Sequence, residues 1–281
     1  MKRVLIPTDF SDNAWDALTY AIRLYDDIPC QFYMVNTFQV GVSQTTTLQH
    51  RTRDTHLYRL IKEDSENQLK KLKNYIDEHL LNDKHEFKTF AKPGDLPTII
   101  NQMVFAENID MIIMGTTGAA GVKEMFIGSN TTKVISTNTF CPVISVPQKY
   151  EYTEVEHILI ATDFKKQFTE IDLRCVIELQ LLHNFSITVL YINYKNGLTS
   201  TQQQNKEALE QLLTYGDVTF TEVKGSKIVA EEVDKFAQYN DIQLIVMGYN
   251  KHSFIEHLTH SPTIKKVSFH CNIPLFIIPK N

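Results

Sequence analysis

Residues 111–134 read MIIMGTTGAAGVKEMFIGSNTTKV, and this stretch decides the predicted fold. It opens with Met111–Met114, four apolar residues in a row, as in a strand buried on both faces of a parallel sheet. Four glycines follow, at Gly115, Gly118, Gly121 and Gly128. Glycine lets a backbone turn and lie close to a ligand because it has no Cβ. The helix expected from Ser129 offers amides, hydroxyls and a positive dipole end, so the stretch predicts a phosphate-binding cradle.

Two widespread phosphate-binding loops do not account for this stretch. The chain contains no GxxxxGK followed by Ser or Thr, and no GxGxxG between a first strand and a first helix. The spacing is instead Gly115, two residues, Gly118, nine residues, Gly128 and then Ser129. A simpler alternative is that these glycines form only a flexible surface turn.

Length and composition indicate an ordinary globular protein. The 281 residues allow one large or two average domains, and 43% are apolar and 22% charged. The net charge of −5, without a block of basic residues, gives nucleic acid or an anionic membrane little to attract. No apolar run approaches the ~20 residues of a membrane-spanning helix. The start, MKRVLIPTDF, predicts a first strand rather than a signal peptide, so we expect a cytoplasmic protein without nucleic-acid or membrane partners.

The four cysteines fit the same compartment. Cys30, Cys141, Cys175 and Cys271 are scattered, with no C-x-x-C pair. Such cysteines are typically reduced and packed in the core, and a redox role for one of them is the alternative.

Strands and helices alternate along residues 1–147. Strands are predicted at Val4–Pro7, Gln31–Asn36, Glu86–Ala91, Met111–Met114 and Pro142–Pro147. Helices are predicted from about Asp12 to Tyr25, His56 to Leu81, Leu96 to Asn108 and Ser129 to Asn138. The polar stretch Phe38–Thr55 is expected to be a loop. This order predicts a parallel sheet with helices on both faces.

The second half repeats the first. Val4–Phe10 (VLIPTDF) matches Ile158–Phe164 (ILIATDF), and Met111–Gly115 (MIIMG) matches Leu244–Gly248 (LIVMG). We therefore expect two domains of one kind, residues 1–149 and 150–281.

The two copies differ at the cradle. Counting from Gly248, Lys251 stands for Gly118, Ser261 for Gly128 and Pro262 for Ser129. A lysine side chain would stand where the backbone has to approach a ligand, and proline removes a backbone donor from the helix start. We therefore expect the second copy not to hold a nucleotide in the same way.

The glycine spacing, the LIPTDFS start and the tandem pattern together resemble the universal stress protein family over nearly the whole chain. The resemblance implies an adenine nucleotide alpha hydrolase-like α/β fold, with two tandem five-stranded parallel-sheet sandwiches of strand order 3-2-1-4-5. In open α/β sheets, ligands bind where the strand order reverses, which is between the first and fourth strands.

The resemblance also implies a site for ATP, with or without Mg²⁺, in the first copy. Pro7, Thr8, Asp9 and the backbone of Val35 would lie near the adenine and ribose. Met114 and Gly115 would line the sugar. Gly118, Gly128, Ser129 and Asn130 would hold the phosphates, although Asn130 replaces a small apolar residue expected there.

Family members that dimerise use the fifth-strand edge. The two halves are therefore expected to form an internal pseudo-dimer through Val143–Val146 and Leu275–Ile278, which would cover two exposed strand edges. Association of two whole chains as a homodimer is a further alternative.

Two other groups of residues carry side chains that could ligate a metal or take part in catalysis. Asp9 suits a hydrogen-bond acceptor better than a metal ligand or base, because no second carboxylate or lysine is fixed near it by sequence. His252, Glu256, His257 and His260 form a dense group, in which His257 and His260, three residues apart, could share a zinc ion on one helical turn. Without a further ligand at a telling spacing, exposed histidines are the simpler interpretation.

Together these observations predict an ATP-binding stress-response regulator that changes state or protein partner with nucleotide occupancy, the partner being unknown. An interaction or small-ligand module without nucleotide dependence and a slow ATPase are the alternatives. No catalytic or metal-ligating residue is predicted.

Overall fold

The computed structural model describes residues 1–39, 48–80, 82–116, 128–138, 140–193, 197–224, 229–249 and 272–279. The first repeat consists of β1 (Lys2–Pro7), α1 (Asp12–Leu24), β2 (Cys30–Phe38), α2 (Leu48–His79), β3 (His85–Pro93), α3 (Leu96–Ala106), β4 (Met111–Gly115), α4 (Ser129–Thr137) and β5 (Val143–Val146). The second consists of β6 (His157–Ala161), α5 (Glu170–His183), β7 (Ser186–Asn193), α6 (Ser200–Leu212), β8 (Val218–Lys224), α7 (Val229–Tyr239), β9 (Leu244–Gly248) and β10 (Leu275–Ile278).

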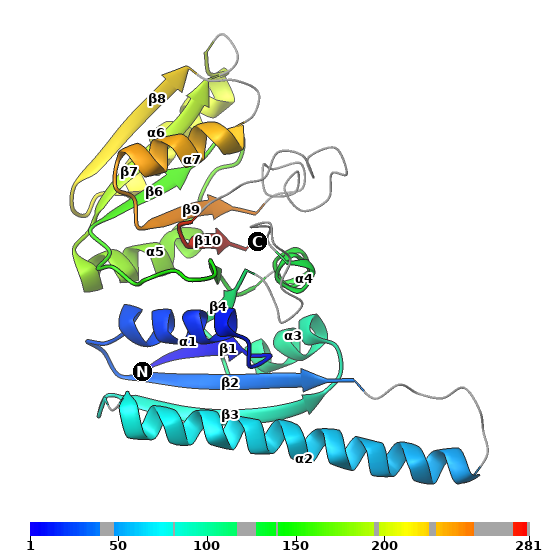
Figure 1. The fold of residues 1–281 in the computed structure, drawn as a ribbon. Coiled ribbons are helices and arrows are strands. Elements are labelled where there is room, and N and C mark those ends of the chain that lie inside the picture. The colour runs from blue at the N-terminus through cyan, green and yellow to red at the C-terminus, as the bar shows by residue number, and fades with distance from the viewer. Residues whose placement is uncertain are drawn as a thin grey trace.

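All ten of these strands belong to one sheet, in the order β3-β2-β1-β4-β5-β10-β9-β6-β7-β8 (Figure 1). Each half therefore has the predicted order 3-2-1-4-5 with parallel neighbours. The two halves join where β5 and β10 pair antiparallel, with Ile144 opposite Phe276. This confirms the expected pairing of the two fifth-strand edges.

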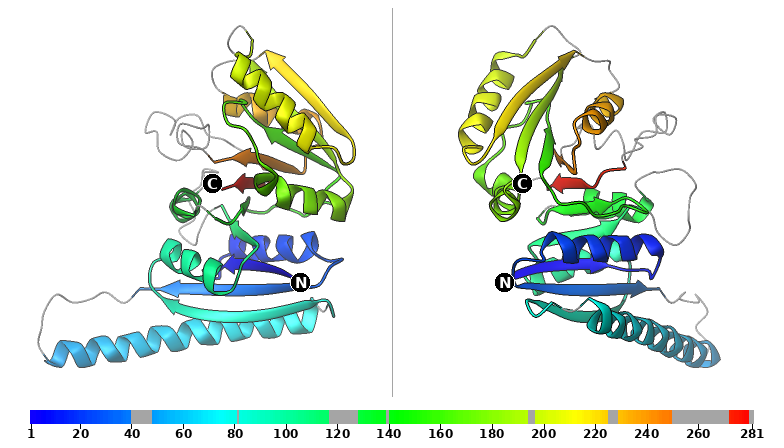
Figure 2. Two further views of the ribbon diagram at one scale, coloured as in Figure 1. Left: turned by 180° about the vertical axis from the view of Figure 1, so that it is seen from behind. Right: turned by 60° about the vertical axis from the view of Figure 1, so that its left-hand side comes forward.

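Helices cover both faces of the sheet, as alternating strands and helices require (Figure 2). Side chains of α1, α2, α5 and α6 pack on one face, and side chains of α3, α4 and α7 pack on the other. The first of these cores runs through both repeats without a break, from Val4 and Ile6 to Ile158 and Ile160. The two repeats thus share one apolar layer.

The long helix α2 differs from the prediction. It begins at Leu48, so residues 48–55, expected to be part of a loop, are helical. Polar composition suggested a loop, but the chain has neither glycine nor proline from residue 42 to residue 92. Polar residues without a helix breaker can extend a helix that is already nucleated.

Side chains also tie the repeats together away from the β5–β10 pair. Tyr20 of α1 makes edge contacts with the rings of Tyr150 and Tyr152 in the connection between the repeats. His183 at the end of α5 lies 2.8 Å, Nε2 to O, from the carbonyl of Leu24 at the end of α1. These contacts fix α1 against the second repeat.

Candidate functional site

The carboxyl ends of β1 and β4 lie side by side, at the point where the strand order reverses. Leu5 is in register with Ile112, so Pro7 and Met114 each lie two residues further along the pair. Beyond β1, the N–H of Thr8 donates to the carbonyl of Val35 in β2 at 2.8 Å. The tertiary structure therefore gathers these predicted site residues at one edge of the sheet.

The loop after β1 is a tight turn built by its own polar side chains. Phe10 has a φ of 63°, in the left-handed region, and its N–H donates to Thr8 Oγ1 at 3.0 Å. Asp9 Oδ1 accepts both the N–H and the hydroxyl of Ser11, at 3.1 and 2.6 Å. Ser11 in turn caps α1 by accepting the N–H of Ala14. The turn holds the exposed Asp9 at the rim of the site.

Gly115 has a structural role that the sequence did not reveal. A Cβ at this position would lie 2.6 Å from Asn13 Oδ1 and 2.8 Å from the Asn13 carbonyl oxygen. The absence of a side chain at Gly115 therefore admits α1. That Gly115 also lines a bound sugar stays a prediction.

The start of α4 lies against the end of β4. The N–H of Gly128 donates to the carbonyl of Thr116, and the hydroxyl of Thr131 donates to the carbonyl of Gly115 at 2.8 Å. Thr131 is buried, so its hydroxyl serves this contact within the protein. Ser129 and Asn130, in the first turn of α4, are exposed.

Among the helices whose N-caps are described, α4 alone has no side-chain hydrogen bond from its N-cap residue to the backbone. Gly128 is its N-cap and supplies no side-chain hydrogen bond. The described N-caps of α1, α3, α5 and α6 all accept one: Ser11, Asp95, Thr169 and Thr199. Helix N-termini without a side-chain cap leave backbone donors for water or an anionic ligand.

The predicted site residues differ in their exposure to solvent. Asp9, Ser129 and Asn130 are exposed, and Thr8, Gly115 and Gly128 are partly so. Pro7, Val35 and Met114 are buried. A further pair of side chains extends the site, because Asn36 donates to the Thr8 carbonyl at 2.7 Å and accepts from Ser65 of α2.

Several predicted positions lie outside the described residues. They are Gly118, Gly121, Lys251, Ser261, Pro262, Cys271 and the group of His252, Glu256, His257 and His260. Within the described ranges, no three His, Cys, Asp or Glu side chains come together as metal ligands would.

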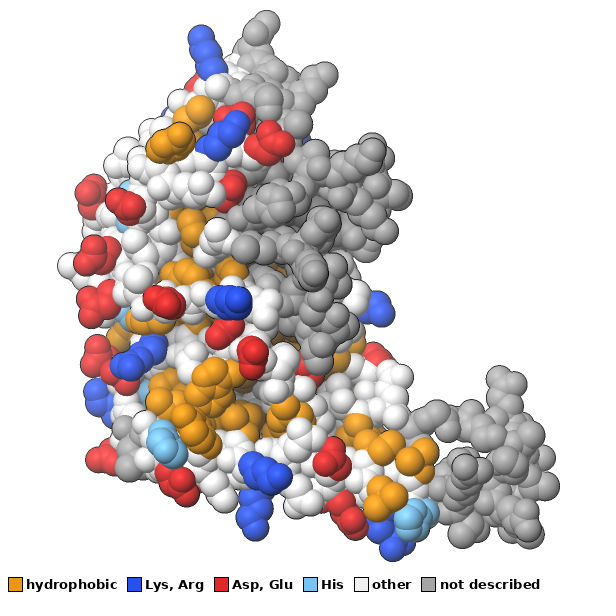
Figure 3. Space-filling view, in the orientation of Figure 1, with side chains coloured by type: hydrophobic (Ala, Val, Ile, Leu, Met, Phe, Trp, Pro, Cys, Tyr) orange, Lys and Arg blue, Asp and Glu red, His pale blue; other side chains and the backbone are white. Residues whose placement is uncertain are grey.

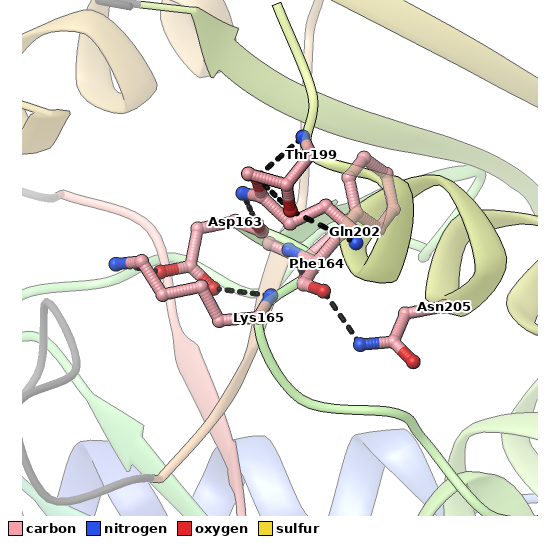
Figure 4. Close-up of polar contacts among 7 residues, drawn as sticks. Asp163, Phe164, Lys165, Thr199, Gln202 and Asn205 are labelled. Atoms are coloured by element: carbon pink, nitrogen blue, oxygen red, sulfur yellow. Dashed lines mark hydrogen bonds and ion pairs between the residues drawn. The ribbon is translucent and has the colours of Figure 1, made fainter.

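In the second repeat, side chains of the loop itself and of α6 hold the corresponding loop in place (Figure 4). The carboxylate of Asp163 pairs with Lys165, Nζ to Oδ2, at 2.7 Å. Gln202 and Asn205 of α6 donate to the carbonyls of Asp163 and Phe164, at 2.7 and 2.8 Å. In the second repeat, neighbouring side chains therefore bond the carboxylate and the carbonyls that correspond to those at the rim of the first site.

Aromatic side chains replace polar ones around this second loop. By strand register, Tyr191 corresponds to Asn36, and its ring contacts that of Phe164 at 5.6 Å between centroids. The ring of Phe168 lies beside Gly248, where Asn13 lies beside Gly115 in the first repeat. Phe164 is almost fully buried, whereas Phe10 is partly exposed.

Three described cysteines have no disulfide partner and are buried: Cys30, Cys141 and Cys175. Burial raises the pKa of the Cys30 thiol to about 12 and raises the pKa of the other two thiols as well. Since the thiolate is the reactive form, this favours core packing over the redox alternative.

The surface carries charges of both signs. On the face shown in Figure 3, Lys and Arg side chains are interspersed with Asp and Glu. Among the described helices, none has the length and apolar character needed to cross a bilayer.

The fold is a tandem repeat of a parallel-sheet α/β unit. In the first repeat, a helix N-terminus that suits an anion lies where the strand order reverses. Together these two features define the class of this protein. The chain belongs to the universal stress protein family, whose model matches residues 1–147 and 154–279. It is 30% identical over 145 residues to universal stress protein MJ0531 of Methanocaldococcus jannaschii, covering 52% of this chain and 81% of that protein.

Solved structures that resemble the whole chain include two universal stress proteins. A universal stress protein from Archaeoglobus fulgidus has a TM-score of 0.65 at 15% identity, covering 99% of this chain and 96% of its own. A putative universal stress protein from Pseudomonas aeruginosa has a TM-score of 0.55 at 13% identity, covering 99% and 93%. At such identities the likeness shows the fold alone.

Asn13 was missed by the sequence analysis. Its signal was available, because Asn13 lies four residues before Ala17 and eight before Ala21, on the buried stripe of α1. A polar residue on such a stripe is expected to have a buried hydrogen-bond partner.

Proposed function

We propose that the first repeat binds ATP, with or without Mg²⁺, and that occupancy changes the protein's state or its affinity for a protein partner in a cytoplasmic stress response. The observation that carries the proposal is the start of α4, which lacks a side-chain cap and lies against the end of β4. Family membership supports adenine as the base.

Each part of the ligand has residues suited to it. The exposed carboxylate of Asp9 suits a ribose hydroxyl, and the Val35 backbone, bonded to Thr8, lies on the side proposed for the base. The backbone donors at Gly128, Ser129 and Asn130 suit phosphate oxygens, joined by Gly118 from outside the described residues. A bound Mg²⁺ would neutralise part of the phosphate charge.

One nucleotide per chain is expected. In the second repeat, Lys165 pairs with Asp163, and α6 side chains take the neighbouring carbonyls. A ligand at this position would have to break these contacts, so we assign the second repeat a structural role in holding the first.

Binding rather than turnover is the proposed activity. The sequence fixes no second carboxylate or lysine beside Asp9 to serve as the pair of groups that efficient phosphoryl transfer uses. A nucleotide that is bound but not rapidly hydrolysed can act as a stable signal of cellular state.

Isothermal titration of the full-length chain tests this proposal. We expect ATP to bind saturably with a stoichiometry of one, and Asp9→Asn to raise Kd roughly 10-fold by weakening a charge-assisted hydrogen bond. Asp9→Asn keeps an acceptor for the Ser11 N–H, so the turn should persist. Gly118→Trp should abolish binding by filling the cradle.

Asp163→Asn, at the matching position of the second repeat, is the control and should leave both Kd and stoichiometry unchanged. Two equivalent sites, or no saturable binding of ATP or AMP by the wild-type chain, would contradict the proposal.

A further inference from the structure

Asn13 connects three parts of the molecule from a buried position. It belongs to the first turn of α1 and is only 2% exposed. Its Nδ2 donates to the carbonyl of Val146, the last residue of β5, at 3.1 Å. Its Oδ1 lies 3.5 Å from the Thr116 hydroxyl, which donates to it. An amide is the side chain that supplies a donor and an acceptor to these two neighbours at once.

A path of hydrogen bonds leads from Asn13 to the start of α4. The Val146 carbonyl accepts the Asn13 amide and also the backbone N–H of Thr116, at 2.9 Å. The carbonyl of Thr116 then accepts the N–H of Gly128, the N-cap of α4. Asn13 therefore bonds the hydroxyl of Thr116 and shares the Val146 carbonyl with the Thr116 amide. Thr116 in turn bonds the residue from which the phosphate-facing helix begins.

The second repeat offers an internal comparison. The backbone bond is kept there, because Tyr249, which follows β9, donates its N–H to the carbonyl of Ile278 at 2.9 Å. The side chain beside Gly248, however, is the ring of Phe168, which has no hydrogen-bonding group. The strand-to-strand bond thus forms without an amide, so the fold alone does not account for Asn13.

We propose that Asn13 is a positioning residue for the nucleotide's phosphates, acting through Val146 and Thr116 on the orientation of the α4 N-terminus. This inference rests on the proposed function. It predicts a selective effect, because the adenosine end of the ligand is held by β1 and β2, whereas the phosphate end depends on the Asn13 path.

The test compares the affinities of the full-length chain for ATP and AMP. Asn13→Leu preserves the size of the side chain and removes both hydrogen bonds, and Asn13→Asp preserves the shape and replaces the amide donor by oxygen. We expect either variant to raise Kd for ATP about tenfold and Kd for AMP by less than about threefold.

Asn138→Leu is the matched control. Asn138 is also a buried asparagine of the first repeat, with its Nδ2 bonded to the Cys141 carbonyl at 2.5 Å and its Oδ1 accepting two backbone N–H groups. It precedes β5, at the end of the sheet opposite the carboxyl ends of β1 and β4. Its loss should therefore lower the denaturation midpoint without changing the ratio of the Kd values for ATP and AMP.

An equal loss of affinity for both nucleotides, no change in either, or the same change of ratio in Asn138→Leu would overturn the positioning role. Failure of both Asn13 variants to fold by circular dichroism would also overturn it, since Asn13 would then be a structural residue. Absence of nucleotide binding by the wild-type chain is a separate result that would overturn the proposed function itself.

Discussion

At Gly115 a hydrogen atom stands where any other residue would place a Cβ, and Asn13 fills the space that remains. The nearest atoms include the backbone oxygen of Asn13, which cannot move without shifting α1. Among the described residues, the matching Gly248 has only the edge of the Phe168 ring nearby, at 3.4 Å, an ordinary contact distance. The same glycine thus serves two different environments in the two repeats.

We expect Gly115→Ala to destabilise the chain by about 1–3 kcal/mol through overpacking against α1. Gly248→Ala should cost less than about 1 kcal/mol, because a ring can shift more easily than a helix backbone. Urea denaturation of the two variants measures the difference. Equal midpoints would show that the first glycine is not required for helix packing.

The helix α2 packs on the sheet through only part of its length. Leu69 and Ile76 are buried against the sheet, whereas Leu57, Tyr58 and Leu60 are exposed. Figures 1 and 2 show the N-terminal part of α2 extending beyond β3. The stability that α2 contributes should therefore come from its C-terminal half.

This difference gives a test within one helix. Leu69→Ala removes a buried side chain and should cost about 2–5 kcal/mol. Leu60→Ala, nine residues earlier and half exposed, should change stability by no more than about 0.5 kcal/mol. Thermal and urea denaturation would reveal the contrast, and a large effect of Leu60→Ala would mean that the projecting part is packed in solution.

The ten-stranded sheet makes the two repeats a single unit, and His183 lies where they meet. Burial lowers the pKa of His183 below its usual 6.5, although the hydrogen bond to Leu24 and the charges of Asp27 and Glu154 act in the opposite direction. The folded chain therefore binds this proton more weakly than the unfolded chain. Its contribution to stability is present above pH 6.5 and is lost as pH falls through the lower folded-state pKa.

We expect His183→Gln to flatten the fall of unfolding free energy on acidification below about pH 6.5, because glutamine does not titrate and can still donate to the Leu24 carbonyl. His79→Gln, on the exposed side of α2 and outside the contact between the repeats, is the control for replacing a histidine by glutamine. Chemical denaturation at several pH values provides the measurement. An unchanged slope in His183→Gln would show that His183 is not the group responsible.

Much of this architecture could be predicted from the amino-acid sequence. The apolar run at Met111–Met114, the repeat of VLIPTDF as ILIATDF and the alternation of strands with helices each depend on local residue patterns. Such patterns fix the side-chain period and the positions of turns, so they predicted the two parallel-sheet repeats. The strand order was implied by the resemblance to the universal stress protein family, which the glycine spacing and the repeated motifs carry. The start of α2 was the exception, because polar composition alone does not separate a loop from an exposed helix.

Contacts between distant residues could not be read in this way. That Asn13 lies on Gly115, that Thr131 turns its hydroxyl to the end of β4 and that Gln202 holds the loop at Asp163 all depend on how helices dock on the sheet. These pairs are 102, 16 and 39 residues apart in the chain. The spacing of residues in the sequence shows the local period of each helix and strand. The partner of a buried side chain depends on tertiary packing, which forms only when the helices and strands have assembled.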